Sequence, residues 1–180
     1  MNSKKIKLIL IITPLLVLFS YFFTALYSFH QFHKGIYYND KKLIKDYVEW
    51  DELRENFKNY INIQLLKETQ KSDELKNLGE FGILLSGLAS KFVETMVDSY
   101  LNPEGLSMLI EKSEKKDEIP KPTFLTLIGG FTIMDFNSLS SFYVTYENEG
   151  QELPIFFNRK GLTWKITQIE FPGDLLENLR

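Results

Sequence analysis

His30 and His33 are the only histidines in the chain, and their spacing places both imidazoles on one face of a helix. Imidazole is a common metal ligand, but a closed zinc site needs four ligands. The nearest carboxylate in sequence is Asp40, and the chain contains no cysteine. We therefore expect neither a metal site nor a cofactor.

Several carboxylates follow the histidines closely. Paired carboxylates can perform acid–base catalysis when burial separates their pKa values. Asp40 and Asp51, however, each precede a helical apolar pattern, where a side-chain oxygen caps the helix start. Glu49 and Glu52 suit solvated positions nearby, so we expect no catalytic residue. The alternative is a small isomerase or hydrolase that uses Asp40 or Asp135 as a base in an aromatic cavity.

Other side chains could bind a ligand. Arg54 follows Trp50 by four residues, so its guanidinium could stack on the indole, pair with Glu49 or Asp46, or receive an anion. Aromatic residues on later strands could line a pocket in a curved sheet, although such residues more often form plain core. These strand residues are Phe142, Tyr143, Phe157 and Trp164, and the ligand-binding candidates are Trp50, Arg54, Tyr143, Phe157 and Trp164.

Composition excludes several classes of function. The 180 residues carry a net charge of −3, with three lysines and no acid in the first 29, so residues 30–180 carry −6. An acidic domain lacks the basic surface that nucleic-acid binding needs. The sequence also has no phosphate-binding glycine loop, serine elbow or zinc-helix motif.

The segment from Leu8 to Phe29 holds no charged residue across 22 positions. A helix of this length crosses a hydrocarbon core of roughly 30 Å. The three lysines before it indicate a cytoplasmic N-terminus. We therefore expect residues 1–29 to be a single-pass anchor that contacts the lipid bilayer through residues 8–29. Because the apolar pattern continues beyond the anchor, the last two turns before His30 are expected either in the headgroup region or in protein.

A cleaved signal peptide is the alternative for this segment. Signal peptides have a shorter apolar run and small residues at positions −3 and −1 before the cleavage site. Phe23 stands two residues before Ala25, and Leu26 stands two before Ser28, so both candidate sites are poor. The sequence therefore favours an uncleaved anchor.

Residues 30–180 read as one α+β domain with segregated halves. In the helical half, 30–112, the anchor helix continues to Asn39 and a short helix follows Asp40. Trp50-Asp51 is predicted to open a longer helix that runs to about Lys67, with Asp51 as its N-cap. Residues 68–79 are polar and predict a loop or frayed helix.

The last helices of this half have clear signals. Helix 81–101 carries an apolar stripe at helical spacing and is predicted to be a buried core helix, since its uncharged part is too short to span a membrane. Asn102-Pro103-Glu104 predicts the start of another helix. The stripe consists of Leu84 or Leu85, Leu88, Phe92, Met96 and Tyr100.

Residues 113–122 are charged, contain two prolines and predict a linker to a β half at 123–172. Residues 124–131 and 132–136 predict strand, and later strands are predicted at 139–146, 153–158 and 162–171, with turns at Glu149-Gly150 and Lys160-Gly161. Leu162, Trp164 and Ile166 should share a face, and a bulge near Thr167-Gln168 would restore register. The result is an antiparallel meander of three or four strands.

Four stretches resemble domain-of-unknown-function family 2939, which comprises small bacterial proteins with an N-terminal anchor. They are residues 33–61, 97–110, 138–146 and 154–172, and VEWDELR and GLTWKI are their most specific parts. Gly35 and Asn39 stand where the family commonly shows Ala and Gly. The resemblance implies an anchored envelope domain without a known activity. The element order also resembles the nuclear-transport-factor-two-like (cystatin-like) cone, a fold that does not itself specify function.

These features predict a membrane-anchored, non-enzymatic envelope domain that binds a partner protein or an apolar ligand. We expect it in the inner (cytoplasmic) membrane, with the domain in the periplasm or outside the cell. A third possibility is a structural tether in which helix 81–101 pairs with another chain.

Overall fold

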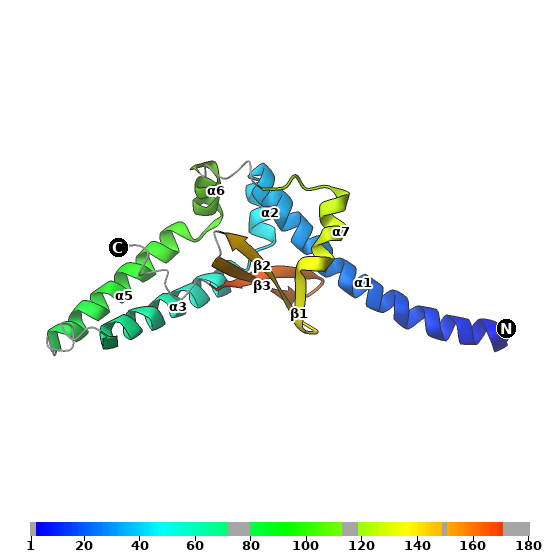
Figure 1. The fold of residues 1–180 in the computed structure, drawn as a ribbon, viewed down its shortest axis with the longest axis horizontal. Coiled ribbons are helices and arrows are strands. Elements are labelled where there is room, and N and C mark those ends of the chain that lie inside the picture. The colour runs from blue at the N-terminus through cyan, green and yellow to red at the C-terminus, as the bar shows by residue number, and fades with distance from the viewer. Residues whose placement is uncertain (1–2, 72–79, 113–118, 149–150, 171–180) are drawn as a thin grey trace.

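In the computed structural model, the described residues are 3–71, 80–112, 119–148 and 151–170, and they form an α+β fold, as predicted. Figure 1 shows a long N-terminal helix, further helices and a small antiparallel sheet. The helices are α1 (Ser3–Tyr38), α2 (Lys41–Asp46), α3 (Trp50–Lys71), α5 (Glu80–Tyr100), α6 (Pro103–Lys112) and α7 (Phe124–Ile133). The strands are β1 (Met134–Ser138), β2 (Ser141–Asn148), β3 (Gln151–Lys160) and β4 (Thr163–Ile169).

Helix α1 has two parts with different surroundings. Every residue from Leu8 to Ser20 is exposed, whereas Ala25, Leu26 and Ser28 are buried. The described residues contain one helix that is long and apolar enough to cross a membrane, and it is this one. Helix α1 therefore continues from its exposed apolar part into the domain without a break, as predicted, and supplies part of the core.

The connection after α1 is built by local polar contacts. Asn39 adopts a φ of 53°, a left-handed conformation that ends the helix. The Asp40 carboxylate then accepts hydrogen bonds from the amides of Lys42 and Leu43, which confirms it as the cap of α2. The cap predicted at Asp51 is wrong, because α3 already begins at Trp50 and Asp51 lies in its first turn.

Helices α5 and α6 occur where they were predicted. Asn102 caps α6 by accepting a hydrogen bond from the amide of Gly105 over 2.8 Å. The predicted burial of the α5 stripe is wrong, because Leu88, Phe92, Met96 and Tyr100 are all exposed. Helix α5 turns Val97 inward instead, and it packs along α3. Of the polar segment 68–79, residues 68–71 extend α3 and the rest lie outside the described residues.

The strand predicted at 124–131 is wrong, because these residues form helix α7. A short apolar run fits a buried strand and a buried helix equally well. Here Thr123 and Thr126 form a reciprocal capping box that starts a helix. Gly130 lets α7 approach α1 closely, since a Cβ there would lie 2.7 Å from Leu26 Cδ1. Most of the predicted linker, residues 113–118, lies outside the described residues.

The sheet is an antiparallel meander in the order β1-β2-β3-β4, as predicted, with all four strands present. Phe156 pairs with Gln168 and Phe157 pairs with Ile166, so Thr167 is the extra residue of the predicted bulge. Asn56 of α3 donates to the Thr167 carbonyl over 2.9 Å and so satisfies the bulged backbone. The turn predicted at Glu149-Gly150 lies outside the described residues.

The β3–β4 turn contains Gly161, whose φ of 66° favours glycine. Leu162 was predicted to face the same way as Trp164 and Ile166, and this is wrong. It occupies the turn itself and is exposed, whereas Trp164 and Ile166 are buried. A residue in a two-residue turn leaves the pleated alternation, so strand periodicity does not fix its direction.

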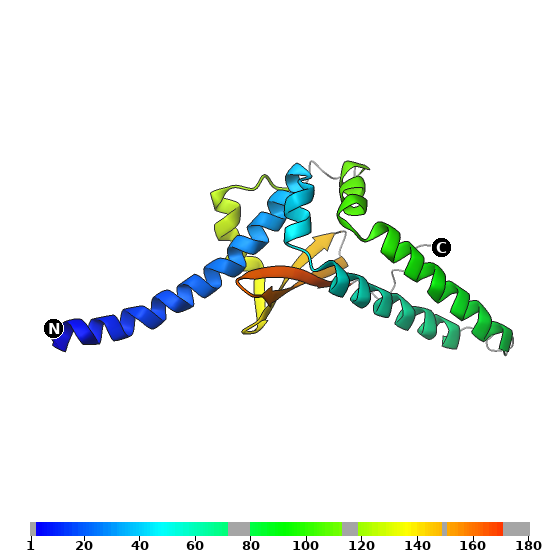
Figure 2. The same ribbon diagram turned by 180° about the vertical axis from the view of Figure 1, so that it is seen from behind.

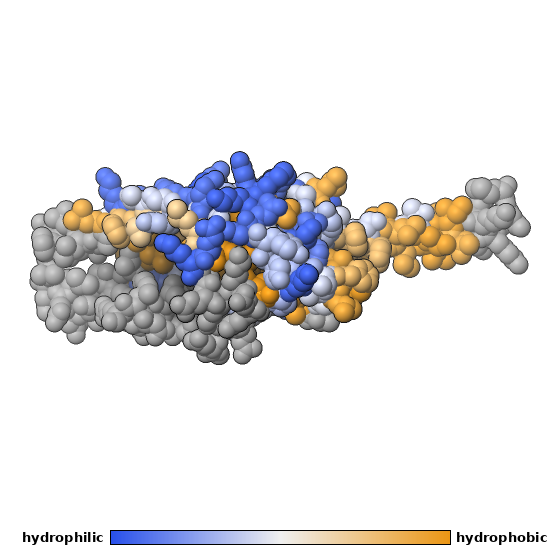
Figure 3. Space-filling model, turned by 90° about the horizontal axis from the view of Figure 1, so that it is seen from above, coloured by the Kyte–Doolittle hydropathy of each residue, from blue (hydrophilic) through white to orange (hydrophobic). Residues whose placement is uncertain are grey.

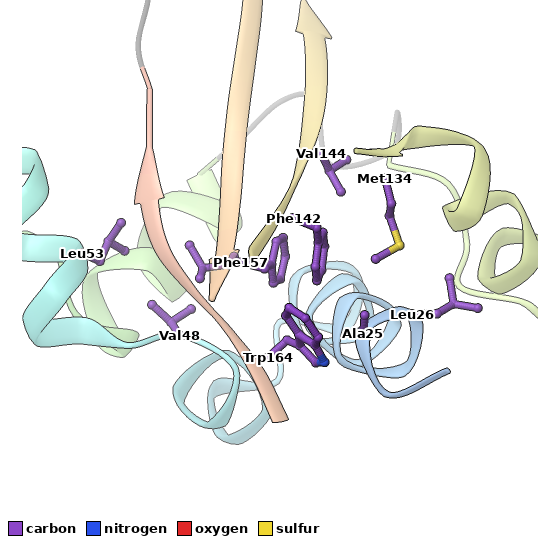
Figure 4. Packing of buried hydrophobic residues seen from close by; sticks show 10 residues of the cluster. Ala25, Leu26, Val48, Leu53, Met134, Phe142, Val144, Phe157 and Trp164 are labelled. Atoms are coloured by element: carbon purple, nitrogen blue, oxygen red, sulfur yellow. The ribbon is translucent and has the colours of Figure 1, made fainter. Parts of the chain in front are cut away.

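The core lies between the inner face of the sheet and the helices. Figure 4 shows Phe142, Phe157 and Trp164 from three strands meeting Ala25 and Leu26 of α1. Val48 and Leu53 close one side, and Met134 and Val144 close the other. The α2–α3 connection covers the outer edge of β4, where the backbone amide of Glu49 donates to the Ile166 carbonyl over 2.8 Å.

Candidate functional site

The junction between α1 and the sheet centres on Trp164, which is fully buried. Its indole Nε1 donates to Thr24 Oγ1 over 3.1 Å, and its backbone amide donates to Ser28 Oγ over 3.1 Å. The Tyr21 ring meets the indole edge-on, with centroids 5.4 Å apart. Two polar side chains and one aromatic ring thus fix α1 to the last strand.

The strand aromatics expected to line a pocket pack directly against one another. Phe142 and Phe157 stack with ring centroids 4.7 Å apart, and Phe142 lies 5.3 Å from Trp164. Tyr143 alternates to the other face of the sheet, where it lies 5.3 Å from Phe156. The structure therefore brings Phe157 and Trp164 together as core and separates Tyr143 from them. Their assignment to ligand binding stays a prediction.

Trp50 and Arg54 occupy the first turns of α3. Trp50 is partly buried and packs against the core cluster. The Arg54 guanidinium donates to Asp51, and to the Leu101 carbonyl over 3.3 Å, rather than pairing with Glu49 or Asp46. Arg54 therefore ties α3 to the end of α5, and a ligand-binding role for it stays a prediction.

A hollow of about 450 Å³ lies between α3 and α5. Its two cations are already engaged with acidic neighbours, since Arg54 contacts Asp51 and Lys58 lies 2.6 Å from Asp98. An anionic ligand would have to displace these carboxylates. The lining is polar and predominantly acidic, and comprises Asp51, Arg54, Glu55, Lys58, Asn59, Asn62, Glu94 and Asp98.

The enzymatic alternative required a buried aspartate base. Asp40 is exposed and already accepts two backbone hydrogen bonds as a cap. Asp135 is exposed on β1, on the face opposite the buried Met134. Neither carboxylate lies in an aromatic cavity, so the alternative built on these two residues is wrong.

His30 and His33 lie on α1 where it enters the domain. Burial lowers the pKa of His33, and a hydrogen bond with the Pro120 backbone partly opposes this effect. Burial also lowers the pKa of His30, with further lowering by His33 and Lys34. Both imidazoles therefore favour the neutral form. Within the described residues, no group of three or more acidic or histidine side chains could hold a metal ion.

Sequence reasoning missed two features. Thr24 and Ser28 were placed in the uncharged anchor run, whose last turns were expected either among the headgroups or in protein, and their four-residue spacing on one helix face was not used to decide between the two. The exposed α5 stripe was read as core, since periodicity identifies an apolar face but not its partner. Helix α6 also carries two exposed apolar residues, Met108 and Leu109.

Comparison with known proteins gives one match. The sequence pattern of the family described as "Protein of unknown function (DUF2939)" matches residues 15–109, which run from within α1 to α6. No match was found among curated proteins or among solved structures. Because the match covers more than half of the chain, this protein belongs to the DUF2939 family.

Proposed function

We propose that this protein is a single-pass, membrane-anchored envelope domain that binds a partner protein and is not an enzyme. The observation that carries the proposal is the apolar stripe of α5. Leu88, Phe92, Met96 and Tyr100 are between 43% and 66% exposed and lie along one helix face. A contiguous exposed apolar surface of this kind is typical of protein interaction sites.

The anchor is supported by the contrast within α1. An apolar helix that is exposed from Leu8 to Ser20 would be unfavourable in water, because the hydrophobic effect disfavours such exposure. Cleavage after Ala25 or Ser28 would remove Tyr21 and Thr24, which hold Trp164. These contacts favour an anchor that is retained.

The proposed orientation places the N-terminus in the cytoplasm and the domain in the periplasm or outside the cell. Lys4, Lys5 and Lys7 support it through the excess of positive charge found on the cytoplasmic side. Protease added to intact spheroplasts should digest the domain. Full protection of the domain, with digestion after lysis, would contradict this orientation.

Partner binding is tested by photo-crosslinking in intact membranes. A photoreactive amino acid at Phe92 or Met96 should yield a discrete adduct, since both side chains lie on the exposed stripe. The matched control is Lys91, which is exposed on the same helix but does not belong to the stripe. Equal adduct patterns at all three positions, or none, would contradict the proposal.

An apolar ligand is less well supported than a partner protein. The aromatic residues expected to surround it fill the space between the strands, with Phe142 and Phe157 in stacking contact. The hollow between α3 and α5 is lined by polar and charged side chains. Neither location offers the mostly apolar concavity that small-molecule sites usually provide.

A further inference from the structure

The exposed part of α1 is too short for the bilayer it is proposed to cross. Thirteen consecutive residues, Leu8 to Ser20, are exposed, and they span about 20 Å as a helix. A hydrocarbon core of roughly 30 Å needs about 20 residues. Counted from Leu8, the hydrocarbon would extend to about Tyr27. The domain already packs on α1 from Tyr21 onward, so domain and lipid must share this part of the helix.

Two β-hairpins approach α1 at this same level. From α7 into β1 the chain moves toward the N-terminal end of α1, since Gly130 of α7 lies against Leu26 and Phe29, whereas the Phe136 ring of β1 lies 5.0 Å from the Phe22 ring between centroids. The β1–β2 turn begins three residues later, at Leu139. Figure 2 shows both hairpin turns pointing toward the side from which the N-terminal half of α1 leaves the domain.

The second hairpin runs in the same direction. Phe157 contacts Phe29 and Phe32, whereas the Arg159 guanidinium lies 4.9 Å from the centre of the Tyr21 ring. The β3–β4 turn follows at Gly161 and Leu162. The two hairpin ends are joined, since the Arg159 amide donates to the Ser140 carbonyl over 2.8 Å.

Each turn presents a leucine to the outside. Leu139 is 84% exposed and Leu162 is 79% exposed. Their immediate neighbours, residues 138, 140, 161 and 163, are serine, glycine or threonine, so neither turn carries an acid. Figure 3 shows apolar surface continuing from α1 onto the adjacent end of the domain.

We propose that the β1–β2 and β3–β4 turns insert Leu139 and Leu162 into the bilayer surface beside α1. The two leucines would complete the apolar surface that α1 alone leaves too short. Arg159 is exposed near the base of the second turn, where its guanidinium lies over the Tyr21 ring and donates Nε–H to the Gly161 carbonyl over 2.9 Å. A guanidinium held at this level can offer its terminal N–H groups to lipid phosphates. This inference rests on the proposed membrane anchor.

Site-specific labelling tests it, because the chain has no native cysteine. Leu139→Cys and Leu162→Cys, each labelled with an environment-sensitive fluorophore, are examined in the full-length protein reconstituted into phosphatidylcholine–phosphatidylglycerol vesicles. Leu109→Cys is the matched control, since Leu109 is a 59% exposed leucine on α6. Leu16→Cys, within the exposed part of α1, reports the anchor itself.

The expected result is strong quenching at positions 139 and 162 by nitroxide groups near the lipid headgroups, with at least a threefold weaker effect at 109. Position 16 should be quenched by nitroxides deep in the acyl chains. Iodide quenching at 139 and 162 equal to that at 109 would overturn the inference while leaving the anchor intact. Loss of deep quenching at 16 would overturn both, and the label at 16 thus distinguishes the two failures.

Discussion

Thr24 and Ser28 are polar residues inside an apolar helix, and the structure gives each a specific partner. The two hydroxyls lie one helical turn apart on α1. Thr24 accepts a hydrogen bond from the indole N–H of Trp164, and Ser28 accepts one from its backbone N–H. A buried N–H without a partner costs about 1–3 kcal/mol, so these two hydroxyls also fix the rotation of α1 against the sheet. These two polar residues of α1 are therefore explained by their contacts with the sheet.

Replacing Ser28 by alanine should lower the free energy of unfolding by about 1–3 kcal/mol, because the buried Trp164 amide loses its acceptor. Urea unfolding of the full-length protein in detergent micelles, followed by tryptophan fluorescence, measures the change. Ser20→Ala is the control, since the exposed Ser20 hydroxyl only donates to the Leu16 carbonyl within its own helix. Equal effects of the two substitutions would contradict the assigned role.

The two histidines predict a pH dependence. Burial lowers the pKa of both below their ordinary value of about 6.5, so the unfolded chain binds more protons than the folded one as pH falls. Their contribution to stability is therefore complete above about pH 6.5 and is lost at lower pH. The urea concentration at the unfolding midpoint should decrease when the pH is lowered from 7.5 to 5.5. The decrease should be smaller in a His30→Gln/His33→Gln variant. An equal or steeper fall in the variant would contradict this.

At the scale of elements, the sequence predicts correctly those features that depend on a few neighbouring residues, such as helix caps and a strand bulge. The Asp40 cap, the Asn102 cap and the Thr167 bulge follow from side-chain oxygens and from a phase change in a strand. The apolar run that forms α7 fits a helix and a strand equally well, so its pattern alone could not predict the helix. Packing against α1 through Gly130 is a contact that this pattern does not contain. The periodicity of α5 likewise identifies an apolar face but does not show whether the domain itself covers that face.

The α5–α6 corner depends on Gly105. A Cβ at this position would lie 2.0 Å from the Tyr100 carbonyl oxygen, a backbone atom that cannot move alone. Gly105→Ala should therefore destabilise the protein by about 1–3 kcal/mol or more through overpacking. Gly87→Ala is the matched control, because its Cβ would meet nothing within 4 Å, and alanine should raise α5 stability by up to about 1 kcal/mol. Chemical denaturation measures the change in the free energy of unfolding for both variants. A change of the same sign in both would contradict the role assigned to Gly105.

At the scale of the whole molecule, α1 joins the proposed anchor and the domain in one continuous helix. Figure 1 shows it running from the free N-terminal end to the top of the domain, past the sheet and α7. The sequence indicated this continuity from apolar spacing beyond residue 29. It could not show that the core begins eight residues earlier, because lipid-facing and core-facing side chains are equally apolar. The candidate ligand residues show the same limit, since aromatic strands form pockets or core depending on what packs over them.

Two truncations separate these roles of α1. Removing residues 1–19 deletes only part of the exposed stretch, so the remaining domain should keep its fold by circular dichroism and give a cooperative unfolding transition. Removing residues 1–29 also deletes Tyr21, Ala25, Leu26 and Ser28, which belong to the core or contact Trp164. Full burial of one leucine side chain alone is worth about 1.5–3 kcal/mol, and whole domains have only about 5–15 kcal/mol. The longer truncation should therefore lack a cooperative transition or aggregate. If both truncated proteins unfold cooperatively with the same midpoint, residues 20–29 are not part of the domain, and the membrane boundary must lie near residue 29 after all.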